Sequence, residues 1–249
     1  MSRTNWRSSP ILRASSTPPA RCAAPRVDGL RVRAIFDAVA RRYDLLNTLC
    51  SLGLHKAWRR AAMRFCPPAA RAIDLCTGTG DWALGLASGC GTVAAVDFSR
   101  QMLAAAAIKT RRARAVRLVT GDAMRLPFRD SSFDLATIGF SLRNMPALLP
   151  FFREAARVLR PGGRLVSLEL TRPSRQPLRA LHRWHLLLVV PMLGALAQRT
   201  AYCYLARSIL DFASPDQVAS LMTQAGFSRV RYLALTGGIA TLHVGLIDR

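Results

Sequence analysis

The chain has 249 residues, of which 51% are hydrophobic, and its 36 Lys and Arg residues against 14 Asp and Glu give a formal net charge of +22. This length suits one domain with a sizeable core, and the apolar fraction excludes disorder throughout the chain. A membrane-spanning helix is not expected, because no apolar run approaches the roughly 20 residues that cross a bilayer.

Almost all of the positive charge is arginine, because Lys56 and Lys109 are the only lysines. Such a charge usually indicates a nucleic acid or an anionic membrane as partner, and a composition biased toward arginine and alanine is the plain alternative. The first 30 residues hold five arginines and one acid, so the rest of the chain still carries +18. The charge therefore belongs to the folded part of the chain.

Residues 1–30 are rich in Ser, Arg, Pro and Ala, and Asp28 is their only acid. We expect a disordered tail here, with an organellar transit segment as the alternative, because transit peptides are rich in Arg and Ser and poor in acids. The six cysteines show no paired spacing, so neither a disulfide framework nor a metal site is expected. One folded domain is expected over residues 31–249.

From Val32 onward, apolar side chains recur at helical spacing on one face, at Val32, Phe36, Val39 and Tyr43. A second helix is expected over residues 54–65. Short apolar strands then alternate with helices, and strands are expected at residues 72–75, 92–96, 116–119, 133–138, 164–168, 230–235 and 239–246. This alternation predicts an α/β fold with a mostly parallel sheet and a ligand crevice at the carboxyl ends of its strands. Residues 175–225 are expected to be largely helical.

A glycine loop follows the first of these strands and opens a helix, in the order Asp74-Leu75-Cys76-Thr77-Gly78-Thr79-Gly80-Asp81. Asp97 ends the next strand, 19 residues after Gly78. Glycines let a ligand approach the backbone, and an acid at the second strand end can accept hydrogen bonds from both hydroxyls of a ribose. Two ligands fit this pattern, a dinucleotide with its pyrophosphate on the loop and S-adenosylmethionine.

The acids distinguish the two ligands. Asp74 and Asp81 flank the glycines, where carboxylates repel a pyrophosphate and attract the cationic methionine part of S-adenosylmethionine. Asp122, followed by Ala123, comes after the third strand, where a carboxylate can accept from an adenine amino group. The spaced set that predicts an S-adenosylmethionine site is Asp74, Gly78, Gly80, Asp97 and Asp122.

From about Val32 to Leu246 the sequence resembles a known family, the ubiquinone/menaquinone biosynthesis C-methyltransferases, or UbiE-like enzymes. The most discriminating segments are Tyr43-Asp44-Leu45-Leu46-Asn47 and Leu142-Arg143-Asn144. Further matching segments are Ser51-Leu52-Gly53-Leu54-His55, Leu126-Pro127-Phe128, Arg160-Pro161-Gly162-Gly163 and Tyr204-Leu205-Ala206.

The resemblance implies a Rossmann-like, seven-stranded class I S-adenosylmethionine-dependent methyltransferase fold. N-terminal helices precede this fold, and a helical insertion at residues 175–212 covers the substrate before the last two strands. It implies methylation of a ring carbon on a polyprenylated quinol, mainly demethylmenaquinol to menaquinol. A 2-methoxy-6-polyprenyl-1,4-benzoquinol is the alternative acceptor, and a homodimer is left open.

The resemblance also assigns residues. Cofactor contacts are expected from Thr79, Asp97, Asp122 and Ala123. Gly139 stands where the family often has a serine, so the contact of that serine is either missing or made by Ser141.

Methylation at carbon requires a quinol hydroxyl to lose its proton, which pushes charge onto the ring carbon. We expect Arg143, at the carboxyl end of the fourth strand, to lower the pKa of that hydroxyl, with Asn144 as a neutral donor. Tyr43 is the third residue expected at the reacting centre. Tyr43, His55 and His243 are the candidate proton acceptors, directly or through water.

A basic segment precedes an apolar one in the helical insertion. Arg175, Arg179 and Arg183 are spaced for one helix face, Trp184 follows them, and an apolar run begins at Leu186. This pattern is typical of a helix in a membrane interface, and a core-packed helix with a solvated basic face is the alternative. We expect residues 175–197 to form a roof through which a lipid quinone enters, so the protein would lie at the cytoplasmic side of the inner membrane. An organellar location follows instead if residues 1–30 are a transit peptide.

Two other classes of protein are alternative interpretations of the same sequence features. A nucleic-acid or small-molecule methyltransferase would share the cofactor site, and the absence of an Asn-Pro-Pro-Tyr type motif argues against methylation of a nucleic-acid base. A basic RNA-binding protein with a vestigial methyltransferase fold would not need the acids at successive strand ends. No nucleic-acid partner is therefore expected.

Overall fold

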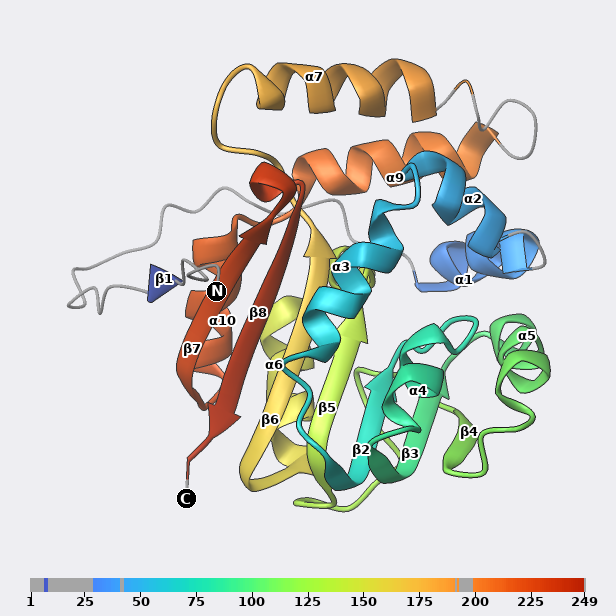
Figure 1. Cartoon of the computed structure of the whole chain (residues 1–249), viewed down its shortest axis with the longest axis vertical. Helices are drawn as coiled ribbons and strands as arrows, with labels where there is room; N and C mark the ends of the chain where they lie inside the picture. The colour runs from blue at the N-terminus through green and yellow to red at the C-terminus, as the bar shows by residue number, and fades with distance from the viewer. Residues whose placement is uncertain (1–6, 9–28, 41–42, 191, 193–198, 249) are drawn as a thin grey trace.

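One sheet organises the part of the chain that the computed structural model describes, residues 7–8, 29–40, 43–190, 192 and 199–248. Its strand order is β1-β7-β8-β6-β5-β2-β3-β4 (Figure 1). The strands are β1 (Arg7–Ser8), β2 (Ala69–Leu75), β3 (Cys90–Asp97), β4 (Val116–Thr120), β5 (Phe133–Gly139), β6 (Leu159–Leu170), β7 (Phe227–Leu235) and β8 (Ala240–Ile247). All seven expected strands are present, and the two-residue β1 adds to the edge formed by β7.

The strands β4, β3, β2, β5 and β6 are parallel neighbours, and β8 runs antiparallel to both β6 and β7. The register pairs Asp74 with Thr137 on β5, and Asp97 with Thr120 on β4. Parallel pairing brings the carboxyl ends of these strands to one edge of the sheet, as the alternation of elements predicts. The polar residues at the strand ends therefore meet there.

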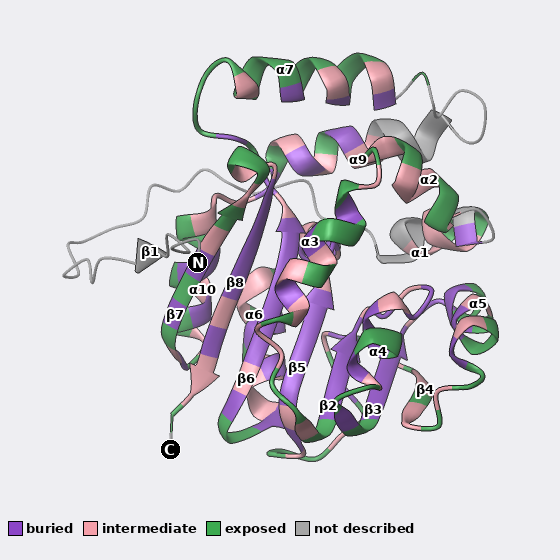
Figure 2. Ribbon diagram, in the orientation of Figure 1, coloured by how far each residue is buried: buried purple, intermediate pink, exposed green. Residues whose placement is uncertain are grey.

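Helices cover both faces of the sheet and enclose two apolar cores. One core packs α6 (Leu148–Val158) and α10 (Pro215–Gln224) on one face. The other packs α3 (Leu54–Met63) and α4 (Asp81–Leu86) on the opposite face, with Trp58 and Trp82 as its largest side chains. Figure 2 shows the resulting band of buried residues along the central strands. The helix α5 (Arg100–Thr110) begins after Ser99, whose hydroxyl accepts from the backbone N–H of Met102.

Two local expectations differ from the structure. The helical pattern that starts at Val32 is divided into α1 (Gly29–Val39) and α2 (Tyr43–Cys50), so Tyr43 begins a second helix. The sixth strand begins at Leu159, because the Pro161-Gly162-Gly163 segment lies within β6 and does not precede it. Apolar spacing continues across the first boundary, and the Pro-Gly-Gly segment is typical of a turn, so neither boundary is evident from the pattern.

The helical insertion stands over one end of the sheet. It contains α7 (Leu178–Trp184), the π-helical segment η3 (His185–Val189) and α9 (Arg199–Asp211), and α7 lies above α9 at the top of Figure 1. A third apolar cluster, Leu186, Val190, Ala206 and Ile209, joins them. Residues 191 and 193–198 of the expected roof, and residues 1–6 and 9–28 of the expected tail, lie outside the described residues. No helix among the described residues is long and apolar enough to cross a membrane.

Candidate functional site

A cavity of about 140 Å³ lies at the carboxyl ends of the parallel strands, beneath α1 and α2. Six of the residues predicted for the site line it: Tyr43, Gly78, Asp97, Asp122, Ala123 and Asn144. These residues come from α2 and from four separate segments of the sheet edge. The fold therefore brings together most of the expected cofactor residues and two of the three expected catalytic ones, and we call this space the cofactor cavity.

Asp97 organises the floor of the cofactor cavity. Its Oδ2 accepts from the backbone N–H of Gly78 at 2.8 Å, and its Oδ1 accepts from that of Ser99 at 2.9 Å. Burial raises the pKa of Asp97, although both hydrogen bonds oppose this. Gly78 has a φ of +56°, which L side chains rarely adopt, and a Cβ there would lie 3.9 Å from the ring of Tyr43. Glycine thus lets the loop turn directly under Tyr43.

Asp122 and Ala123 form the wall that follows β4. Asp122 is exposed, and its Oδ1 accepts from the backbone N–H of Met124 at 2.8 Å. Ala123 is buried beside it. This placement leaves carboxylate oxygen accessible to an amino group in the cofactor cavity.

Asp74 lies behind the glycine loop and does not line the cofactor cavity. Its two oxygens accept from the hydroxyls of Thr77 at 2.6 Å and Thr137 at 2.8 Å. Burial raises the pKa of Asp74 to about 6 in spite of these bonds. Asp74 stabilises the loop from beneath, and its direct contact with a cofactor stays a prediction.

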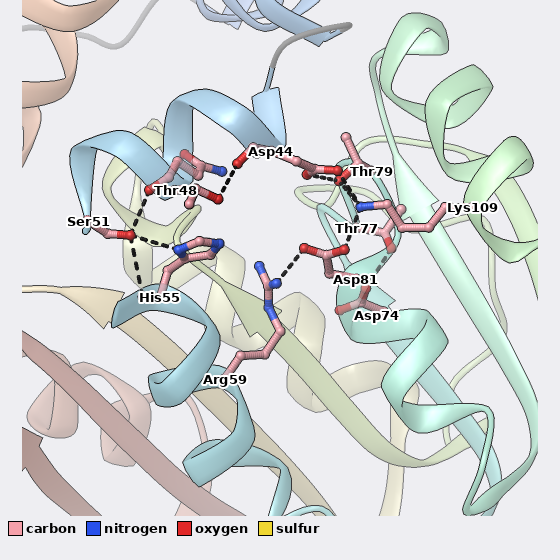
Figure 3. Close-up of polar contacts among 11 residues, drawn as sticks. Asp44, Thr48, Ser51, His55, Arg59, Asp74, Thr77, Thr79, Asp81 and Lys109 are labelled. Atoms are coloured by element: carbon pink, nitrogen blue, oxygen red, sulfur yellow. Dashed lines mark hydrogen bonds and ion pairs between the residues drawn. The ribbon is translucent and has the colours of Figure 1, made fainter. Parts of the chain in front are cut away.

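Lys109 of α5 joins the N-terminal helices to the glycine loop (Figure 3). Its Nζ lies 2.6 Å from Asp44 Oδ2 and 2.5 Å from Asp81 Oδ1, and it donates to the hydroxyl of Thr79 at 2.9 Å. The Thr79 hydroxyl donates in turn to Asp44 Oδ1 at 2.7 Å. Arg59 of α3 pairs with the other oxygen of Asp81. We call Asp44, Arg59, Thr79, Asp81 and Lys109 the lid network.

The lid network changes the electrostatic expectation for the loop. Burial raises the pKa of Asp81, but Arg59 and Lys109 outweigh it and hold that pKa below its ordinary value. Two cations, Arg59 and Lys109, therefore already neutralise the Asp81 carboxylate. Asp81 does not provide the attraction for a cationic ligand that the sequence predicts. Thr79 and Gly80 likewise do not line the cofactor cavity, and Gly80 packs against Ala106 of α5.

Arg143 lies in the 3-10 turn η2 (Leu142–Asn144) with its side chain only 6% exposed. Its Nη1 donates to Glu169 Oε1 at 2.5 Å and to the carbonyl of Phe140 at 2.6 Å. Glu169, at the end of β6, is fully buried and also accepts from the N–H of Leu170 at 2.8 Å. Arg143 does not line the cofactor cavity, so its contact with substrate stays a prediction. Sequence reasoning does not identify Glu169, although it lies near the carboxyl end of a parallel strand as Asp97 does.

Asn144 lines the cofactor cavity and carries a buried amide donor without a partner in the described residues. Its Oδ1 accepts from the hydroxyl of Tyr204 on α9 at 3.0 Å. Its Nδ2 is buried and has no hydrogen-bond partner in the described part of the chain. A buried amide donor without a partner costs free energy on the order of 1–3 kcal/mol, so it indicates a group that a ligand satisfies. Tyr204 belonged to a matching segment of the sequence, but no role was assigned to it.

The three candidate proton acceptors lie in different surroundings. Tyr43 lines the cofactor cavity, and burial raises its pKa although Asn47 and Arg143 lower it. His55 bonds through Nδ1 to the Ser51 hydroxyl at 2.7 Å, outside the cavity lining. His243 lies on β8 with Nε2 3.0 Å from the carbonyl of Pro215, and burial lowers its pKa to about 4. Only Tyr43 is placed to meet a ligand, as a protonated donor.

The Gly139 position is explained by a tryptophan. A Cβ on Gly139 would lie 2.3 Å from Nε1 of Trp82, so no larger residue fits while this indole is in place. Ser141 lines the cofactor cavity instead, and its hydroxyl donates to the carbonyl of Gly139 at 3.3 Å. The structure thus favours Ser141 for the contact that Gly139 lacks.

Apolar side chains complete the cofactor cavity, and sequence reasoning assigned none of them. They are Phe36, Cys76, Phe98, Met102, Met124, Met145 and Pro146. Phe36 meets Tyr43 edge to face, with ring centroids 6.1 Å apart. For Cys76, Phe98 and Met124 the available signal was their position one or two residues after a predicted acid at a strand end. No cluster of metal ligands occurs among the residues that the structure describes.

Comparisons with known proteins show which family this chain resembles. A family model described as the ubiE/COQ5 methyltransferase family matches residues 25–247. A demethylmenaquinone methyltransferase of Bacillus licheniformis is 38% identical over 222 residues, which cover 86% of this chain and 96% of that protein. One from Staphylococcus haemolyticus is 37% identical over 222 residues, with 86% and 93% covered.

Solved structures share the fold at low sequence identity. An S-adenosylmethionine-dependent methyltransferase of Thermotoga maritima is 20% identical with a TM-score of 0.64, covering 86% of this chain and 99% of that one. The phosphoethanolamine N-methyltransferase 2 of Haemonchus contortus, in complex with S-adenosyl-L-methionine, is 16% identical with a TM-score of 0.57, covering 77% and 52%. These likenesses confirm the predicted Rossmann-like methyltransferase fold.

Asp74→Asn should change how stability depends on pH. The folded state holds the Asp74 proton more tightly than the unfolded chain does, because burial raises its pKa from 3.8 to about 6. The contribution of this group to folding is therefore greatest at low pH and is lost as the pH rises through 6. Between about pH 4 and pH 7.5, wild type should lose up to ~3 kcal/mol of unfolding free energy that the variant does not lose. The unfolding free energies of both proteins are measured by denaturant titration at several pH values. A difference between them that does not change with pH would contradict the account.

Lys109→Met should loosen α2 from the glycine loop and weaken S-adenosylmethionine binding. Because Tyr43 of α2 lines the cofactor cavity, we expect the dissociation constant to rise about three- to tenfold at low salt. The difference should shrink as salt screens the ion pairs of the wild type. Lys56→Met is the matched control, since Lys56 is the other lysine and is exposed on α3 without an ion pair in the described residues. Equal titration calorimetry curves for both variants would rule out this role.

Proposed function

The chain belongs to the ubiE/COQ5 methyltransferase family, and we propose that it methylates a ring carbon of demethylmenaquinol, with S-adenosylmethionine as the methyl donor. Support for the acceptor comes from the relatives named demethylmenaquinone methyltransferase, which match over most of their length. The observation within this chain that carries the proposal is Asn144, which lines the cofactor cavity and whose buried Nδ2 has no partner among the described residues.

The residues present fit S-adenosylmethionine. The left-handed turn at Gly78 removes a side chain from the floor of the cavity. Asp97 and Asp122 line that cavity, and we propose that they accept hydrogen bonds from the ribose hydroxyls and from the adenine amino group, respectively. Asp97 and Asp122 also supply the negative potential that suits a cationic ligand, because neither forms an ion pair in the described residues. When bound, S-adenosylmethionine supplies an electrophilic methyl group.

The quinol needs a donor for its oxygen as charge develops there. Loss of a quinol hydroxyl proton to water would push electron density onto the ortho and para ring carbons. One of these carbons could then take the methyl group as the bond between that group and sulfur breaks, which would leave S-adenosylhomocysteine. The hydrogen on that ring carbon would depart to water as a proton, which restores aromaticity. We assign Asn144 Nδ2 as the donor that stabilises the phenolate oxygen, and Tyr43 as a second, protonated donor.

Arg143 and Glu169 act from behind these donors. The Arg143 guanidinium lowers the pKa of both Tyr43 and Tyr204, while burial raises them. Its pair with Glu169 fixes the turn that carries Asn144. We therefore propose Arg143 and Glu169 as positioning residues that hold the turn carrying Asn144 in place. Holding the ring carbon about 3–3.5 Å from the methyl group would supply much of the acceleration.

The proposal also places the protein at a membrane surface, where a polyprenyl tail resides. Four apolar side chains lie on one outward side of the helical insertion, Leu181, Trp184, Leu188 and Met192, and they are 61%, 55%, 49% and 72% exposed. Exposed apolar side chains gathered on one helix face are typical of an interfacial helix. We propose that this outward face contacts the cytoplasmic side of an anionic membrane and that a second copy of the chain is the competing occupant.

Asn144→Ala should lower kcat for methylation of reduced demethylmenaquinol by roughly 10- to 100-fold, because one preorganised donor to the phenolate is lost. The dissociation constant of S-adenosylmethionine should change less than twofold, since Asp97 and Asp122 remain. Methyl transfer is measured side by side with demethylmenaquinol and 2-methoxy-6-polyprenyl-1,4-benzoquinol, and the first should be the better acceptor. No methylated product from either quinol with the wild-type protein would overturn the proposed function.

Leu181→Ser/Leu188→Ser should reduce binding to vesicles that contain anionic lipid by roughly tenfold, because two apolar side chains no longer enter the interface. The matched control is Leu84→Ser/Ile108→Ser, which removes exposed apolar side chains of α4 and α5. Vesicle sedimentation measures the binding, and light scattering records the oligomeric state. Unchanged vesicle binding together with conversion of a dimer to a monomer would assign the outward face to self-association instead.

A further inference from the structure

A second cavity, of about 300 Å³, lies beside α7 and α9, apart from the cofactor cavity. Three arginines line it, Arg172 from the segment after β6, and Arg179 and Arg183 from α7. His182 and Asp211 are its other titratable residues. We call this space the basic cleft.

The cations of the basic cleft are not balanced within the described residues. Neither Arg179 nor Arg183 forms an ion pair there, and Arg172 is engaged only by the carbonyl of Phe212, at 3.1 Å from its Nη2. Asp211 is the one carboxylate on the wall, against three guanidinium groups. A concave site with this excess of positive charge favours an anion. Guanidinium groups suit phosphate best, since they donate pairs of parallel hydrogen bonds to its oxygens.

The position of the basic cleft indicates where that phosphate comes from. His182 of α7, Leu186 of η3 and Val190, which follows η3, are buried. Leu181, Trp184 and Leu188 are exposed on the opposite side. Arg179 and Arg183 line the cleft on the protein side of the same helix. A helix is about 10 Å across, and the headgroup layer of a bilayer is on the order of 5–7 Å thick on each side. An outward face buried about 5–10 Å into the boundary between headgroups and acyl chains therefore brings the far side of the helix, and the basic cleft with it, to the level of the lipid headgroups.

We propose that the basic cleft binds the phosphate group of an anionic phospholipid, held by Arg172, Arg179 and Arg183. This inference rests on the membrane contact that we propose for the outward face of α7. It adds a specific lipid site to a contact that apolar side chains alone would make equally with neutral lipids. A lipid bound there fixes α7 over α9, the helix whose Tyr204 bonds to Asn144.

The test compares wild type with Arg179→Gln/Arg183→Gln in vesicle sedimentation. The matched control is Arg111→Gln/Arg112→Gln, which removes the same charge from two exposed residues that follow α5. The vesicles are pure phosphatidylcholine, phosphatidylcholine with about 30% phosphatidylglycerol, and phosphatidylcholine with enough oleate to give the same surface charge. Inorganic phosphate is titrated separately by calorimetry.

Wild type and the control should bind phosphatidylglycerol vesicles about tenfold or more tightly than phosphatidylcholine vesicles, and more tightly than oleate vesicles. The Arg179→Gln/Arg183→Gln variant should lose this preference and retain the weak binding to phosphatidylcholine. Equal losses in the variant and the control would overturn the lipid site, because only net charge would matter. Tight binding of inorganic phosphate by wild type, with no preference among the vesicles, would assign the cleft to a free phosphate and overturn it too.

Methylation of demethylmenaquinol in detergent micelles separates this inference from the proposed function. Turnover in micelles should be equal for wild type and the Arg179→Gln/Arg183→Gln variant, because the basic cleft does not line the cofactor cavity. Absence of product from wild type would contradict the proposed function. Normal turnover by a wild-type protein that binds no vesicle would contradict the lipid site alone.

Discussion

The convergence of parallel strand ends is the constraint on which the site depends. Because β2, β3, β4 and β5 run in the same direction, the residues that follow each strand lie at the same edge of the sheet. Asp97 ends β3 there and bonds to the backbone of Gly78, which follows β2. The cofactor cavity and the turn that carries Asn144 are consequences of this single geometry. The N-terminal helices only cover what the strands have already assembled.

Residues at strand ends were predictable because their position depends on chain order and strand direction. Asp97 and Asp122 could be placed from spacing alone, and both line the cofactor cavity. Lys109, Glu169 and Tyr204 were assigned no role, because their partners are set by tertiary packing between distant segments. Lys109 contacts Asp44 across 65 positions of the chain, and Tyr204 contacts Asn144 across 60. Apolar periodicity carries no signal for such pairs. It also cannot show that Asp81 is neutralised by Arg59 and Lys109.

The large positive charge has a different meaning at different places in the fold. Near the glycine loop, Arg59 and Lys109 form ion pairs with Asp44 and Asp81 and so hold α2 and α3 against the loop. At the basic cleft, Arg179 and Arg183 lack ionic partners in the described residues and face an open cavity. The acids that remain for the cofactor, Asp97 and Asp122, line the cofactor cavity and form no ion pair in the described residues. A basic protein thus keeps a negative site for a cationic ligand, because its few acids converge at one edge of the sheet.

The central claim is that the site transfers a methyl group to a ring carbon of a quinol, with Asn144 satisfied by the quinol oxygen. The most direct measurement uses S-adenosylmethionine whose methyl carbon is labelled with carbon-13, reduced demethylmenaquinol and NMR of the purified product. The account predicts one labelled resonance, that of a methyl group bonded to an aromatic ring carbon. A labelled resonance from a methoxy carbon, or recovery of the label in no quinol product, would contradict it.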